Sequence, residues 1–170
     1  PSLRYKIGVV PQEYALYPTL TARENLHYFG SLYGLKGKEL KVKTDEALER
    51  VALSTVADKK IAHFSGGMKR RINLVAGILH TPEVLFLDEP TVGVDVQSKN
   101  IIIDYLKELN ARGMSALYTS HHLQEAQDFC NRIGILSEGQ LIKEDTPERL
   151  IKEAEVYNLE EAFIQVTNNK

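Results

Sequence analysis

The stretch FSGGMKRRINLVAGILHTPEVLFLDEPTVGVD, residues 64–95, decides the fold of this 170-residue chain. After Ser65-Gly66-Gly67, apolar residues recur at helical spacing, which predicts a helix over about 68–80. Thr81-Pro82 end that helix. The apolar run VLFL then predicts a strand that is buried on both faces of a parallel sheet. The acidic turn Asp88-Glu89-Pro90 follows that strand. The predicted helix and strand therefore have one group of polar residues before the helix and a second group after the strand.

The flanking sequence alternates short apolar runs with helical patterns. The patterns predict helices at 21–33, 39–52, 97–111 and 122–130 and strands at 5–10, 84–88, 115–119 and 132–136. Strands 84–88, 115–119 and 132–136 are separated by helices, which indicates an α/β parallel sheet with right-handed crossovers. A turn after residue 136 also predicts a hairpin with residues 140–143.

Composition excludes several classes of protein. The net charge is −2, so bulk attraction to nucleic acid is not expected. A single cysteine, Cys130, cannot form an intrachain disulfide framework or a cysteine metal cluster. No apolar run approaches the roughly 20 residues that a membrane-spanning helix needs.

The Ser-Gly-Gly before the predicted helix 68–80 is a candidate anion site. Ser65 is a suitable N-cap, and Gly66 and Gly67 leave main-chain N–H groups unshielded. A helix N-terminus carries a partial positive charge that favours anions. The same pattern also fits an ordinary capped helix with a solvated basic face.

Other polar residues follow the predicted strands directly. Asp88 and Glu89 end strand 84–88, Gln12 follows strand 5–10, and His121 follows strand 115–119. The carboxyl ends of parallel strands are where open α/β sheets bind ligands. Asp88 and Glu89 alternate sides, so one can hold Mg²⁺ while the other polarises a water. A polar surface turn and a satisfied histidine are the plainer interpretations.

In this order and spacing, the motifs resemble those of the ATP-binding subunits of ATP-binding cassette (ABC) transporters, over essentially the whole chain. VVPQ looks like the Q-loop, FSGGMKRR like the LSGGQ signature and VLFLDEP like the Walker B strand. Gly93-Val94-Asp95 resembles the D-loop, and His121 resembles the switch histidine. Met68 and Phe64 depart from the usual Gln and Leu of the signature, and Val94 and Val96 from the usual Leu and Pro of the D-loop.

The resemblance implies a role for each residue of the catalytic edge. Asp88 would help to hold Mg²⁺, and Glu89 would be the general base. Gln12 would contact Mg²⁺ and the attacking water, and would sense the membrane partner. His121 would contact the γ-phosphate of ATP.

The resemblance also implies a dimer. Ser65, Gly66 and Gly67 would grip the γ-phosphate of ATP bound to a second nucleotide-binding subunit, and Asp95 would cross the dimer interface. A membrane-spanning permease subunit would hold the protein at the cytoplasmic face of the cell membrane. The signature and the ending LEEAFIQVT are similar to the exporter branch of the family.

The fold that the resemblance implies is a P-loop NTPase-like (RecA-like) sheet with a helical subdomain. Residues 1–12 and 81–170 would belong to the RecA-like core, and residues 13–64 would form the helical subdomain, which continues into the signature helix 65–80. Such a subunit binds ATP and Mg²⁺ and hydrolyses ATP.

One motif of the family does not occur in this sequence, namely the phosphate loop G-x-x-x-x-G-K-[ST]. We expect that loop, and the first strands of the sheet, to lie before Pro1, so that the chain is a piece of a longer protein and inactive by itself. Without the phosphate-loop strand, strand 84–88 would have a bare edge and the piece would self-associate. A non-transport ABC ATPase and an inert interaction fragment are the alternative functions.

Overall fold

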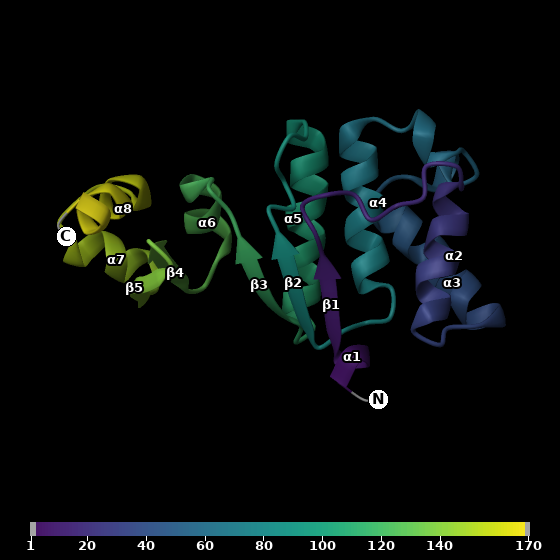
Figure 1. Cartoon of the computed structure of the whole chain (residues 1–170), viewed down its shortest axis with the longest axis horizontal. Helices are drawn as coiled ribbons and strands as arrows, with labels where there is room; N and C mark the ends of the chain where they lie inside the picture. The colour runs from purple at the N-terminus through teal and green to yellow at the C-terminus, as the bar shows by residue number, and fades with distance from the viewer. Residues whose placement is uncertain (1–2, 169–170) are drawn as a thin grey trace. The chain divides into compact units, whose positions relative to one another are not determined.

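The computed structural model describes residues 3–168, which form two compact units that divide between Thr119 and Ser120. The first unit contains α1 (Leu3–Lys6), β1 (Ile7–Val10), α2 (Ala22–Leu32), α3 (Gly37–Arg50), the 3₁₀ turns Ser54–Val56 and Ile61–His63, α4 (Gly66–Ile78), β2 (Val84–Asp88), α5 (Val96–Ala111) and β3 (Ser115–Thr119) (Figure 1). The second contains α6 (Leu123–Phe129), β4 (Ile133–Ser137), β5 (Gln140–Asp145), α7 (Pro147–Glu153) and α8 (Leu159–Asn168).

The sheet of the first unit is parallel, with the order β1-β2-β3. The alternation of strands and helices therefore predicted its type correctly, but not all of its members. β4 was expected in this sheet, whereas it pairs antiparallel with β5 in a separate two-stranded sheet. Glu138 and Gly139 both have positive φ, 51° and 78°, as a tight hairpin turn requires, and this turn makes the predicted hairpin.

Both edges of β2 are hydrogen-bonded, one to β1 and the other to β3. The expectation that this strand would have a bare edge is therefore wrong, because β3 lies where the phosphate-loop strand was expected. The self-association that was inferred from that edge loses its premise.

One face of the sheet is exposed, although β2 was predicted to be buried on both faces. Leu85 and Leu87 are buried, but the alternate residues Val84 and Phe86 are 36% and 40% exposed. Leu117 of β3, which pairs with Phe86, is 58% exposed. A continuous apolar run thus belongs to a strand that has only one covered face within the described residues.

Helices α4 and α5 lie on the covered face (Figure 1). α4 approaches β1 through glycines. A Cβ atom at Gly77 would lie 2.6 Å from Val10 Cγ2 and 2.8 Å from the carbonyl oxygen of Val9, and one at Gly8 would overlap the carbonyl oxygen of Gly77. These distances are shorter than real Cβ contacts, so the helix and the strand touch main chain to main chain.

Strand β1 begins later than predicted, at Ile7, because residues 3–6 form the helical turn α1. The Tyr5 ring contacts the Tyr33 ring edge-to-face, with the two ring centroids 6.2 Å apart. The main-chain oxygen of Lys6 accepts a hydrogen bond from the N–H of Glu83. This bond comes immediately before the pairing of Ile7 with Val84.

Helices α2 and α3 pack with α4 around a core that includes Leu26, Leu48 and Ile72. The predicted capping box at the start of α2 is confirmed: Thr21 Oγ1 accepts from the N–H of Glu24 at 3.1 Å, and the Glu24 carboxylate accepts from the N–H of Thr21 at 2.8 Å. This reciprocal pair satisfies two donors of the first turn and holds α2 at its observed start.

The second unit has its own small core of Ile135, Leu150 and Leu159. Thr146 caps α7, and Pro147 is the first residue of that helix, where proline is favoured. Among residues 3–168, no helix combines the length and the apolar character that crossing a membrane requires.

Candidate active site

The carboxyl ends of β1 and β2 bring Gln12 and Glu89 together. Val10 pairs with Leu87 in the parallel register, so the segments that follow β1 and β2 leave the sheet at the same edge. Gln12 Nε2 donates a hydrogen bond to Glu89 Oε2 at 3.3 Å, although the two residues are 77 positions apart. Asp88 is the last residue of β2 and lies beside Glu89 in the chain.

The backbone of Glu89 is held in an unusual conformation. Its φ is 45°, in the left-handed region that residues other than glycine rarely adopt. Its N–H donates to the main-chain oxygen and to Oγ1 of Thr119, each at 3.2 Å. Such strain costs about 1–3 kcal/mol and is concentrated at functional sites.

Thr119 is a residue of this edge that sequence reasoning missed. Its Oγ1 donates to Asp88 Oδ1 at 2.7 Å, and Thr119 pairs with Asp88 in the sheet register. A hydroxyl residue at the last position of β3, level with the last position of β2, was the available signal. It orients the carboxylate of Asp88.

The oxygen atoms of Asp88 and Gln12 form a donor set of the type that Mg²⁺ takes. Within residues 3–168, no group of three or more His, Cys, Asp or Glu side chains could hold a metal ion by itself. Mg²⁺ is usually bound by one or two carboxylates together with water and substrate phosphates. The chemistry of the site therefore fits an ion that arrives with a phosphate ligand.

The Ser-Gly-Gly segment begins α4, and the prediction of Ser65 as N-cap is confirmed. Ser65 Oγ accepts from the N–H of Met68 at 3.3 Å. The two glycines have different surroundings. A Cβ atom at Gly66 would meet nothing closer than 3.6 Å, whereas one at Gly67 would lie 2.6 Å from Asp95 Oδ2 and 2.9 Å from Ser98 Cβ. A side chain at Gly66 would therefore make only ordinary contacts, whereas Gly67 packs closely against the start of α5.

Asp95 is the N-cap of α5. Its carboxylate accepts from the N–H and from the Oγ of Ser98, each at 2.8 Å. These hydrogen bonds, the main-chain one first, hold the pKa of the Asp95 carboxyl below its ordinary value. The structure thus gives Asp95 a local role that the D-loop resemblance did not include, and its contact with a second subunit stays a prediction.

His121 belongs to the second unit, where it follows Ser120. Its ring lies beside that of His122, with centroids 4.2 Å apart, and the N–H of His122 donates to Ser120 Oγ at 2.9 Å. The predicted contact of His121 with a phosphate stays a prediction.

Residues 1–92 match the family model described as "ABC transporter". The chain belongs to the ABC transporter family. A solved structure of the ATP binding subunit of an ABC transporter superposes with a TM-score of 0.86 at 26% sequence identity, over 96% of this chain and 69% of that one. The predicted α/β fold of the P-loop NTPase type is thereby confirmed.

Relatives of this ABC chain are named as ATP-binding proteins. Linearmycin resistance ATP-binding protein LnrL of Bacillus subtilis (strain 168) is 50% identical over 169 residues, which are 95% of this chain and 54% of that protein. Nod factor export ATP-binding protein I of Paraburkholderia xenovorans (strain LB400) is 40% identical over 148 residues, 87% of this chain and 49% of that protein. The chain spans about half the length of these relatives.

Proposed function

We propose that the intact protein is the ATP-hydrolysing subunit of a transporter that exports a compound across a membrane. The observation that carries the proposal is the contact of Gln12 with Glu89 at the carboxyl edge of the sheet, beside Asp88. The names of two relatives, one for export of Nod factor and one for resistance to linearmycin, favour the direction of transport.

Each residue at the carboxyl edge of the sheet would have a different role in ATP hydrolysis. Asp88 and Gln12 would hold Mg²⁺, which when bound neutralises charge on the phosphates of ATP. Glu89 would accept the proton of the attacking water as general base, and Gln12 Nε2 orients the Glu89 carboxylate for that role. His121 would donate a hydrogen bond to the γ-phosphate.

The partners are part of the proposal. Ser65, Gly66 and Gly67 would contact ATP held by a second nucleotide-binding subunit. Asp95 would lie at that interface while it caps α5. A membrane-spanning permease would place the subunit at the cytoplasmic face of the membrane.

The test is a Glu89→Gln substitution in the full-length protein. It keeps the shape of the side chain and its hydrogen bond with Gln12 but removes the basic carboxylate, so we expect hydrolysis to fall by about 10²–10⁴-fold while ATP still binds. Glu83→Gln is the matched control, because Glu83 is an exposed carboxylate whose partner is Lys6. Near-normal hydrolysis by the Glu89 variant would refute the assignment of the base.

A further inference from the structure

The main chain of the segment that carries Gln12 is held by a buried arginine of α4. Arg70 is 4% exposed, and its Nη1 donates to the carbonyl oxygen of Gln12 at 2.6 Å and to that of Pro11 at 3.4 Å. The guanidinium also lies over the Tyr14 ring, 4.9 Å from its centroid. The arginine of the signature helix thus contacts three residues of the segment that follows β1.

Asn73, one helical turn further along α4, also forms hydrogen bonds with the main chain of this segment. It is 2% exposed, its Nδ2 donates to the carbonyl oxygen of Pro11 at 3.0 Å, and its Oδ1 accepts from the N–H of Ala15 at 3.1 Å. Pro11 and Ala15 lie on either side of Gln12, so the Asn73 side chain holds both ends of the loop 11–15, called here the Gln12 loop. Arg70 holds the main chain at Gln12 itself.

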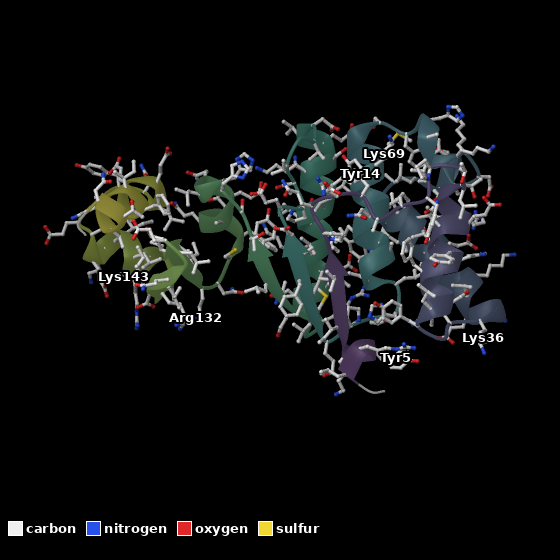
Figure 2. All side chains as sticks on the ribbon, viewed as in Figure 1. Tyr5, Tyr14, Lys36, Lys69, Arg132 and Lys143 are labelled. Atoms are coloured by element: carbon white, nitrogen blue, oxygen red, sulfur yellow. The ribbon has the colours of Figure 1, made fainter. Side chains whose placement is uncertain are left out.

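The loop is tied to the first turn of α4 as well. The Tyr14 hydroxyl donates to the carbonyl oxygen of Gly66 at 3.3 Å, and Figure 2 shows Tyr14 beside the part of α4 where Lys69 is labelled. The hydrogen bonds of Arg70, Asn73 and Tyr14 therefore run from the signature helix to the Gln12 loop within one chain.

Arg70 is a costly residue for a purely structural task. Within residues 3–168 it makes no ion pair, and its buried Nε has no hydrogen-bond partner. A buried charge is destabilising unless it is well paired, and apolar residues of similar volume often stabilise a core better. The guanidinium instead binds main-chain oxygens at Pro11 and Gln12, in the segment that carries the exposed side chain of Gln12.

We propose that Arg70 and Asn73 are positioning residues for hydrolysis, which set Gln12 against Glu89. The proposal rests on the proposed function, because it assumes that Gln12 and Glu89 act on ATP. A shift of the Gln12 main chain moves its amide relative to Glu89 Oε2. Misplacement by about 1 Å from a remote substitution can cost about 100-fold in rate.

The experiment uses Arg70→Met and Arg70→Lys in the full-length protein. Methionine removes every donor, and lysine keeps the charge and one donor group. We expect kcat for ATP hydrolysis to fall by about 10- to 100-fold in Arg70→Met, with partial recovery in Arg70→Lys, and KM for ATP to change little. Asn73→Ser is a second variant that still reports if Arg70→Met does not fold.

A double-substitution cycle with Gln12→Ala separates positioning from stability. If Arg70 acts through Gln12, Arg70→Met lowers kcat in the wild type but has no further effect on kcat in the Gln12→Ala background. The melting temperature, in contrast, should fall by the same amount in both backgrounds. Arg23→Met is the control, since Arg23 is a partly exposed arginine that bonds Asp45 and Asp58. It is expected to leave kcat unchanged.

Two outcomes overturn the inference. If folded Arg70→Met, or folded Asn73→Ser where the first does not fold, keeps wild-type kcat while Gln12→Ala lowers it, the contacts do not position Gln12. If kcat falls equally in both backgrounds, Arg70 acts by a route other than Gln12. A Gln12→Ala or Glu89→Gln protein with full activity would instead refute the proposed function itself.

Discussion

A methyl group added at Gly67 tests how α4 is packed against α5. The new Cβ would lie 2.6 Å from Asp95 Oδ2 and 2.9 Å from Ser98 Cβ, and closer still to Ser98 Oγ. Ser98 is 2% exposed and its Cβ is fixed on the helix, so rotation of the hydroxyl does not relieve the overlap. The start of one of the two helices has to move.

The cost has two parts. Overpacking of a filled site costs about 1–3 kcal/mol. Displacement of Asp95 from Ser98 weakens the N-cap of α5, which contributes about 1 kcal/mol. Alanine is a better helix former than glycine by about 1 kcal/mol, which offsets part of this cost. We expect a net loss of about 1–3 kcal/mol. For a domain of this size, each kcal/mol lowers the melting temperature by about 2–4 °C, so Gly67→Ala should melt about 2–12 °C below the wild type.

Gly66→Ala is the control in the same measurement. Gly66 is adjacent in sequence and lies in the same helical turn, but its added Cβ meets nothing closer than 3.6 Å. Alanine is a better helix former than glycine by about 1 kcal/mol, so this variant should melt at or slightly above the wild-type temperature. Scanning calorimetry that finds equal melting temperatures for the two variants would refute the packing argument.

Two further predictions concern the acidic residues. Glu89→Gly should be more stable than Glu89→Ala by about 1 kcal/mol, because glycine adopts the observed φ of 45° without the strain that alanine keeps; equal unfolding free energies would mean that this backbone is unstrained. The pKa of Asp95 is lowered in the fold, so its charge stabilises the protein above the ordinary carboxyl pKa and that contribution is lost as pH falls through the folded pKa. The melting-temperature advantage over Asp95→Asn should therefore shrink below about pH 4, and an advantage that is constant with pH would contradict the assignment.

Local patterns predicted the elements well, because the information lies within a few residues of each one. The capping box of Thr21 and Glu24 marks the start of α2, and the turn at Glu138 and Gly139 marks the hairpin. The sequence also placed Gln12 and Glu89 just after the ends of strands, but their contact follows only once the structure shows that those strands pair in parallel.

Features that depend on which strands are neighbours could not be predicted in this way. An apolar run looks the same whether one or both of its faces are covered, so the exposure of Phe86 was missed. The pairing of Thr119 with Asp88 depends on β3 lying beside β2, and the bonds of Arg70 to the Gln12 loop join residues 58 positions apart. No local spacing encodes such contacts.

The close approach of α4 to β1 restricts how this chain can change over evolutionary time. A substitution in a packed core is often made tolerable by a second one, because a neighbouring side chain can become smaller. At Gly8 and Gly77 the obstacles include the carbonyl oxygens of Gly77 and Val9, which every amino acid carries. A smaller neighbouring side chain cannot remove them, so we expect glycine at both positions in any relative that keeps this contact.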